Sequence, residues 1–80
     1  MAEAAIPFSA SEAHKLQRRS VRLMKAMGAW PAGTTGDVTD YQDFLYGYMV
    51  QVTWHGPLLG RVINFEYFTK DDFDEYLVEC

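Results

Sequence analysis

The side chains that could bind a metal or act as nucleophiles are few and scattered. His14, His55 and Cys80 are the only soft metal ligands in the sequence. A structural zinc site needs four such ligands, usually in closely spaced pairs. We expect His55 to be an exposed turn residue and Cys80 to be a packed or frayed thiol. The sequence also lacks a phosphate-binding glycine loop, CxxC, HExxH and GxSxG, so we expect neither a metal nor a cofactor.

Two pairs of adjacent carboxylates, Asp71/Asp72 and Asp74/Glu75, are the remaining candidates for acid–base chemistry. Neighbours on a helix diverge by about 100°, so neither pair would form a catalytic dyad. No hydroxyl or thiol nucleophile is paired with a base in any motif that the sequence contains. We therefore expect a protein that is not an enzyme.

The chemistry that remains is recognition by charge. Residues 1–36 carry five Lys or Arg against two Glu, whereas residues 37–80 carry nine Asp or Glu against two basic residues. The candidate acidic partner-binding residues are Asp71, Asp72, Asp74, Glu75 and Glu79. The alternative basic set is Lys15, Arg18, Arg19, Arg22 and Lys25. We expect the two sets to lie on separate faces of the fold, because helices packed on a small sheet turn their polar sides in different directions.

An amphipathic helix over residues 10–27 is predicted to carry the basic set. Ser9 and Glu12 have the spacing of a capping box, and Gly28 suits the left-handed residue after the helix. The apolar face would consist of Ala13, Leu16, Ser20, Leu23, Met24 and Met27. The basic residues would lie nearly opposite, either as a solvated face or as a phosphate-contacting one.

The middle of the chain predicts a loop over residues 29–36, with Trp30 packed against the body. Tyr41, Phe44, Leu45 and Tyr48 have helical spacing, which favours a short helix over residues 40–45. Its rival is an early start of the next strand. Period-2 alternation then predicts an antiparallel hairpin of residues 46–54 and 59–67, turning at residues 55–58. Phe65 and Tyr67 would face the core and Glu66 the solvent.

A two-stranded sheet alone is marginal in water and leaves both edges unpaired. The simplest remedy is pairing across a two-fold axis, which predicts a homodimer through the hairpin edge. A third strand from residues 32–38 is the intramolecular alternative.

The last element is predicted to be an acidic helix. Thr69 and Asp72 form a capping pair, and Phe68 with Phe73 has the spacing of a hydrophobic staple. The expected fold is α+β, in the order α-(α)-β-β-α, as a single domain over residues 1–80 with residues 1–8 flexible. Eighty residues allow one modest core. No apolar run approaches the ~18 residues of a membrane span, and the lone Cys80 suits a reducing cytoplasm.

Three features of the chain are its size, its single-domain α/β character and the acidic run from Asp71 to Glu79. In these features the chain resembles small acidic inhibitors encoded by phages and mobile elements, including the anti-CRISPR proteins. The resemblance implies a stoichiometric blocker of a nucleic-acid-binding or partner surface, with carboxylates replacing phosphates against Lys and Arg clusters. Our first hypothesis is a protein-binding module that uses its acidic half against a basic protein surface. The alternatives are a small nucleic-acid-binding protein that uses the basic set, or a structural assembly subunit.

Overall fold

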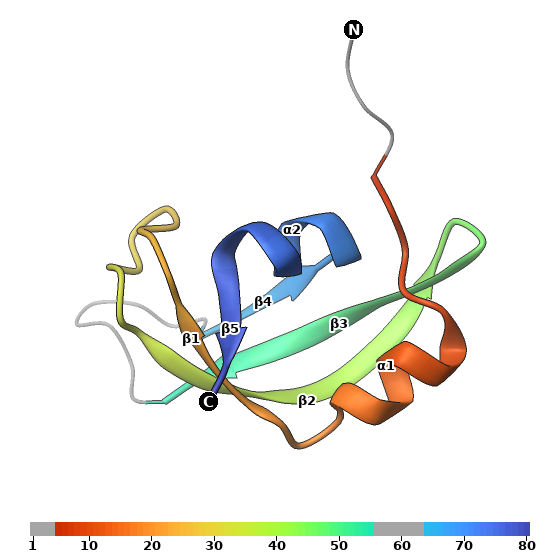
Figure 1. Cartoon of the computed structure of the whole chain (residues 1–80), viewed down its shortest axis with the longest axis horizontal. Helices are drawn as coiled ribbons and strands as arrows, with labels where there is room; N and C mark the ends of the chain where they lie inside the picture. Colours follow the sequence, from red (N-terminus) through yellow and green to blue (C-terminus); the bar gives the residue numbers. More distant parts are fainter. Residues whose placement is uncertain (1–4, 56–63) are drawn as a thin grey trace, which may run out of the picture.

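The computed structural model describes residues 5–55 and 64–80 and consists mainly of one antiparallel sheet (Figure 1). The elements in chain order are α1 (Ala10–Leu16), β1 (Ser20–Leu23), β2 (Thr35–Phe44), β3 (Gly47–Trp54), β4 (Phe65–Phe68), α2 (Lys70–Tyr76) and β5 (Leu77–Glu79). The strand order is β4-β3-β2-β1-β5, and every neighbouring pair is antiparallel. The predicted order α-(α)-β-β-α is therefore wrong, because the fold is β-rich.

The predicted long helix is wrong beyond Leu16. Its capping box is present, since the Ser9 side chain accepts from the Glu12 amide and Glu12 accepts from the Ser9 amide. The helix ends where Gln17 becomes extended and Arg18 takes a φ of 70°. The next residues form β1, in which Val21 and Leu23 are buried while Ser20 and Arg22 are exposed. Hydrogen bonding to both β2 and β5 favours this strand, and a helix would instead have buried Ser20.

The predicted short helix over residues 40–45 is also wrong. β2 runs through this segment and forms a hairpin with β3 around a turn at Leu45 and Tyr46. A β-bulge between Val38 and Asp40 lets this long strand bend. The alternative of a third strand from residues 32–38 is confirmed, because β2 begins at Thr35.

The antiparallel pairing of β3 with β4 matches the predicted hairpin, although residues 56–63 lie outside the described residues. The predicted faces of β4 are inverted. Phe68 is buried opposite Val50, whereas Phe65 and Tyr67 are 36% and 38% exposed. Because side chains alternate along a strand, a one-residue shift exchanges the two faces.

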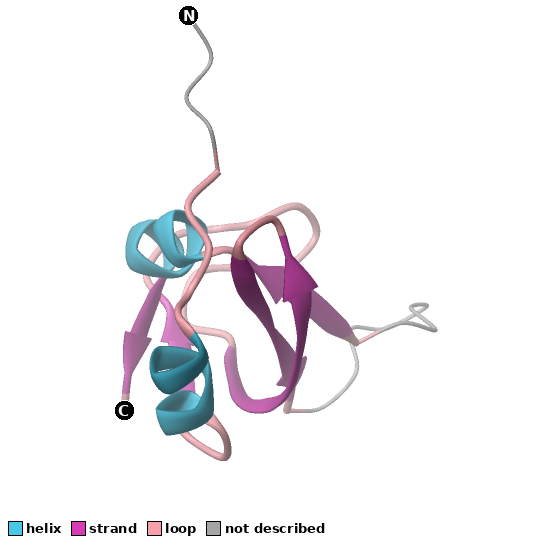
Figure 2. Ribbon diagram, turned by 90° about the vertical axis from the view of Figure 1, so that its right-hand side faces the viewer, coloured by secondary structure: helices cyan, strands magenta, loops and turns pink. Residues whose placement is uncertain are grey.

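The core lies between the sheet and the two helices, which occupy the same side of its β2–β3 part (Figures 1 and 2). Trp54 is its largest fully buried side chain and contacts the rings of Trp30 and Phe68. Trp30 is itself buried, which confirms its predicted packing.

Residues 6–8 lie in line with β4 along the edge of β3. The Phe8 amide donates to the Tyr48 carbonyl at 2.8 Å, and the Tyr48 amide donates back at 2.9 Å. Phe8 is buried, and the Lys70 amide donates to the Ile6 carbonyl at 2.8 Å. These three residues belong to the segment 1–8 for which we expected flexibility, and they connect β3 to the start of α2.

The sheet of five strands removes one reason for expecting a homodimer, since the hairpin is not an isolated two-stranded sheet. β2 pairs with β3, whereas β4 remains at an edge of the sheet. Dimerisation through this hairpin edge stays a prediction. Within the described part of the chain, no helix is long and apolar enough to cross a bilayer.

Candidate functional site

Glu12 joins α1 to α2 and forms one wall of the candidate site. Its Oε1 accepts from the Ser9 amide at 2.9 Å, and its Oε2 accepts from Lys70 Nζ at 2.6 Å. Hydrogen bonding by Lys70 and then by the Ser9 backbone lowers the pKa of Glu12 from 4.5 to about 2. The same contact raises the pKa of Lys70. One ion pair thus connects the two short helices.

Thr69 and Asp71 fix the beginning of α2. The Thr69 hydroxyl accepts from the Asp72 amide at 3.4 Å, as predicted, and donates to Asp71 Oδ1 at 2.6 Å. Asp71 Oδ1 also accepts from the Ile6 amide at 2.9 Å. These contacts, led by that from Thr69, lower the pKa of Asp71. The predicted staple is present as well, with the Phe68 and Phe73 rings 6.5 Å apart.

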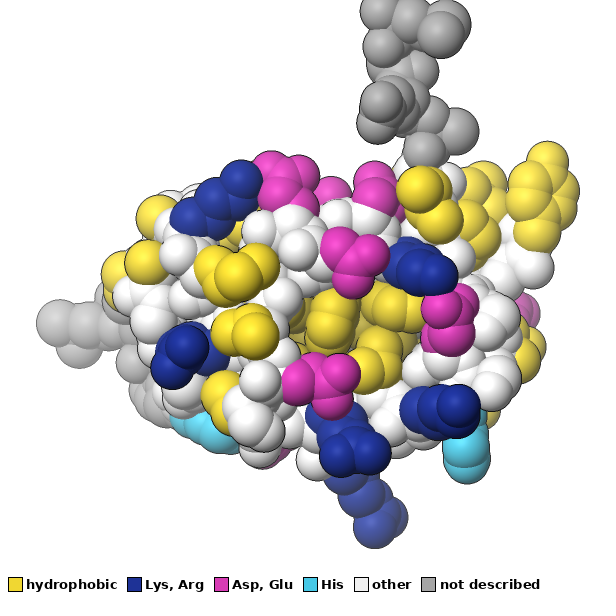
Figure 3. Space-filling model, viewed as in Figure 1, with side chains coloured by type: hydrophobic (Ala, Val, Ile, Leu, Met, Phe, Trp, Pro, Cys, Tyr) yellow, Lys and Arg dark blue, Asp and Glu magenta, His cyan; other side chains and the backbone are white. Residues whose placement is uncertain are grey.

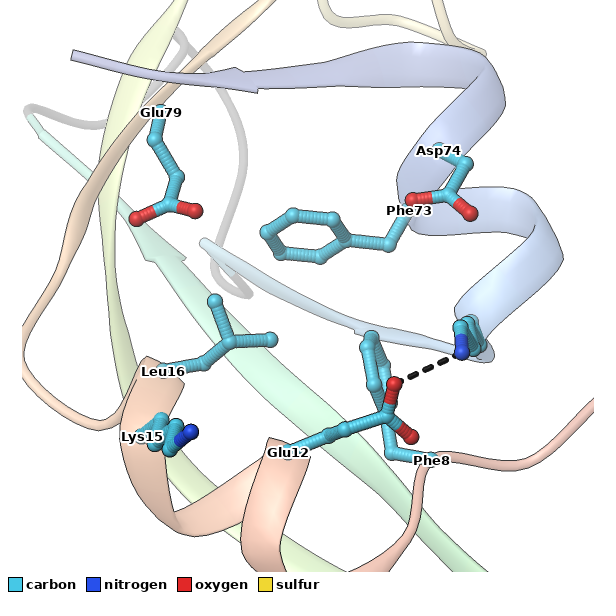
Figure 4. A pocket seen from close by; sticks show the side chains of 8 residues that line it. Phe8, Glu12, Lys15, Leu16, Phe73, Asp74 and Glu79 are labelled. Carbon is cyan, nitrogen blue, oxygen red and sulfur yellow. Dashed lines mark hydrogen bonds and ion pairs between the residues drawn. The ribbon is translucent and has the colours of Figure 1, made fainter.

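Between α1, α2 and β5 lies a hollow of ≈ 270 Å³, which we call the interhelical hollow (Figures 3 and 4). Its apolar floor is formed by Phe8, Leu16 and Phe73. Charged side chains surround this floor, namely Glu12, Lys15, Lys70, Asp74 and Glu79. The Phe8 and Phe73 rings pack edge to face at 5.6 Å, which gives the floor a defined shape.

The charges around the hollow are only partly neutralised. Glu12 and Lys70 pair with each other. Glu79 lies 4.0 Å from Arg19 Nε, and both side chains are exposed, so water screens this contact strongly. Among residues 5–55 and 64–80, Asp74 and Lys15 form no ion pair. The hollow therefore offers an apolar floor with two weakly compensated carboxylates beside it.

The predicted acidic set is divided among different environments. Asp74 and Glu79 line the hollow. Asp71 caps α2 and holds residue 6, and Asp72 is half-buried in the first turn of α2. Glu75 pairs with Lys25 at 2.8 Å. Two of the five carboxylates thus line the same hollow.

The predicted basic set does not form one helical stripe. Lys15 lies on α1 and Arg22 on β1, while Arg18 and Arg19 lie in the connection between them. Lys25 follows β1 and contacts α2 through Glu75. Since Arg19 and Lys25 each lie beside a predicted acidic residue, the expectation of separate acidic and basic faces is wrong.

A polar cluster that links β1, β2 and the end of β3 was missed by the sequence analysis. His55 Nε2 lies 2.9 Å from Asp37 Oδ2, and His55 Nδ1 lies 2.9 Å from the Thr35 hydroxyl. The Ser20 hydroxyl donates to Asp37 Oδ1 at 2.9 Å. Hydrogen bonding by His55 and then by Ser20 lowers the pKa of Asp37. The Thr-x-Asp alternation could have indicated this cluster only once residues 35–44 were assigned to a strand.

This hydroxyl–imidazole–carboxylate chain resembles the order of groups that activates a nucleophile. Its His55 and Asp37 side chains are 49% and 43% exposed, so water competes with every contact. We therefore describe it as a connection between β1, β2 and the end of β3. In the described residues, no three His, Cys, Asp or Glu side chains are grouped to hold a metal ion.

Comparison with protein-family models, with curated proteins and with solved structures found no significant match for this chain.

Proposed function

We propose that this protein is a non-enzymatic protein-binding module whose binding surface is the interhelical hollow. The observation that carries the proposal is a hollow in which the core residues Phe8, Leu16 and Phe73 form an apolar floor inside a ring of charged side chains. An apolar centre with a polar rim is the usual anatomy of a protein interface. The side chain of a partner that enters such a pocket supplies much of the binding energy.

The size of the hollow favours a single side chain over a small-molecule ligand. Its ≈ 270 Å³ lies below the roughly 300–1,000 Å³ of typical ligand pockets. The space-filling view shows it open to the surface (Figure 3), whereas small-molecule pockets enclose most of their ligand.

The partner we propose has a basic surface. The chain carries a net charge of −4, and Asp74 and Glu79 bring negative charge to the hollow itself. Occupation of such a surface would exclude a competing nucleic acid or protein, which is the inhibitory role that the resemblance to phage-encoded inhibitors implies. Direct nucleic-acid binding is less favoured, because the predicted basic set does not form one stripe and Lys25 already pairs with Glu75. We place this activity in the cytoplasm, where an exposed Cys80 thiol stays reduced.

Site-specific photo-crosslinking tests the proposed function. A photoreactive amino acid replaces Lys15 or Asp74 at the hollow, and Asp40 on β2 provides the exposed control position. We expect the two hollow positions to give a covalent adduct of one discrete mass in a cell that contains the partner, and the control to give none. Equal adducts at all three positions, or no adduct at the hollow, would contradict the proposal.

A further inference from the structure

We infer that the end of the β2–β3 hairpin is a second contact surface, which docks in an apolar pocket with Lys or Arg at its rim on a partner protein. We call it the hairpin surface, and it consists of Tyr41, Asp43, Leu45, Tyr46 and Tyr48. These five residues are not among those that line the interhelical hollow. The inference therefore goes beyond the proposed function and can succeed or fail separately from it.

The tip of the hairpin presents two large apolar side chains on a strained backbone. Leu45 and Tyr46 lie between the paired residues Phe44 and Gly47. Leu45 has a φ of 55°, which two-residue hairpin turns normally assign to Gly or Asn. The Leu45 and Tyr46 side chains are 61% and 99% exposed, so neither supplies packing that offsets the strain. A costly conformation that displays apolar side chains to solvent indicates a role in binding.

The face of the hairpin on the helix side extends this apolar tip. Tyr41 pairs with the buried Val50, and Tyr48 precedes Val50 by two residues, so all three side chains share the face towards the core. The rings of Tyr41 and Tyr48 contact edge to face at 5.4 Å, and Tyr41 is 44% exposed. The hairpin projects past α1, with apolar side chains gathered at its end (Figures 1 and 3). Tyrosine-rich apolar surface of this kind is typical of interface centres.

The charge around the hairpin surface favours a basic protein as its partner. Residues 37–55 contain three Asp and no Lys or Arg. Asp43 lies opposite Tyr48, is exposed, and forms no ion pair within the described part of the chain. Nucleic acids and anionic lipids would be repelled. Two copies of the chain that met at their tips would bring their Asp43 carboxylates together. A Lys or Arg at the rim of a partner's pocket would instead pair with Asp43.

Photo-crosslinking in a cell that contains the partner tests where the hairpin surface docks. A photoreactive phenylalanine replaces Tyr41 or Tyr46, and Asp40, which lies opposite Gln51 on the other face of the hairpin, is the control position. We expect both tyrosine positions to give an adduct with one protein and the control to give none. Mass spectrometry of the crosslinked peptide should place the contact in an apolar segment next to Lys or Arg. An adduct with nucleic acid, lipid or a second copy of the chain, a contact elsewhere on the partner, or no adduct would overturn the inference.

Affinity measurements on the purified partner then separate binding from folding. We expect Tyr46→Ala to weaken binding by at least about tenfold. Leu45→Asn should also weaken binding although it relieves the backbone strain, an outcome that a purely structural role of Leu45 would not give. Met24→Ala removes an apolar side chain that is 51% exposed outside the hairpin, and it should leave the affinity unchanged. Unchanged affinity in Tyr46→Ala and Leu45→Asn, or an equal loss in Met24→Ala, would overturn the inference.

The same crosslinking experiment distinguishes this inference from the proposed function. Adducts at Tyr46 without adducts at Lys15 and Asp74 would contradict binding at the hollow and support the hairpin surface. The reverse pattern would support the hollow and overturn the inference drawn from the hairpin.

Discussion

At the scale of single residues, Glu12 connects the two helices that border the hollow. Its carboxylate accepts from both Ser9 and Lys70, and its pKa falls from 4.5 to about 2 on folding. The unfolded chain therefore binds a proton at this position at a higher pH than the folded protein does. The contribution of Glu12 to stability is complete above its unfolded pKa and is lost as the pH falls towards 2.

We predict that the free energy of unfolding decreases between about pH 5 and pH 2, and that Glu12→Gln makes this decrease smaller. Urea denaturation followed by circular dichroism at several pH values measures both. Asp37 and Asp71 also have lowered pKa values, so part of the decrease remains in the variant. An unchanged pH dependence in Glu12→Gln would contradict the importance of the contact with Lys70.

Leu45 is a strained residue at the exposed tip of the β2–β3 hairpin. Its φ is 55°, a left-handed conformation that costs a non-glycine residue roughly 1–2 kcal/mol. The side chain is 61% exposed, so little packing would be lost on replacement. We predict that Leu45→Asn raises the free energy of unfolding by about 0.5–1 kcal/mol, because Asn tolerates this conformation. In a urea titration, Tyr46→Asn serves as the control and should show no such gain.

At the scale of elements, the approach of residues 6–8 to β3 depends on Gly47. A Cβ at this position would overlap the carbonyl oxygen of Phe8 and come within 3.2 Å of Pro7 Cβ. We predict that Gly47→Ala displaces the N-terminal segment and destabilises the fold by about 1–3 kcal/mol. Faster hydrogen exchange at the Phe8 and Tyr48 amides would identify the displaced contact. Gln51→Ala, also on β3, is the control, and an equal loss there would argue against a steric cause.

Local sequence patterns predicted the helix caps and the packed tryptophan. They predicted the wrong element where a segment fits both the helical and the strand periodicity. Ser9–Glu12 and Thr69–Asp72 are caps in the structure because a cap depends on residues three positions apart. Residues 20–23 fit both a helical face and a strand. Only pairing with β2 and β5, which are distant in sequence, selects the strand.

The candidate site was predicted only in part for the same reason. Asp74, Glu79 and Lys15 were among the expected binding residues, and they meet at one hollow. Phe8 was not expected there, because no local pattern shows that residues 6–8 pair with β3. Glu79 reaches the hollow from a strand that the predicted helix would have replaced.

At the scale of the whole molecule, acidic and basic side chains are interleaved around one sheet. Lys25 with Glu75, and Lys70 with Glu12, connect segments that are far apart in the sequence. These pairs bring opposite charges together locally. In the proposed binding module, recognition would then depend on the individual charges at the hollow more than on the field of the whole protein.

The position of β5 beside β1 also determines when the chain can complete its fold during synthesis. Val21 and Leu23 pair with Glu79 and Leu77, so β1 cannot acquire its second neighbour until residue 79 has emerged from the ribosome. Until then the nascent polypeptide exposes an incomplete edge of the sheet, which is the condition in which chaperones bind and aggregation begins.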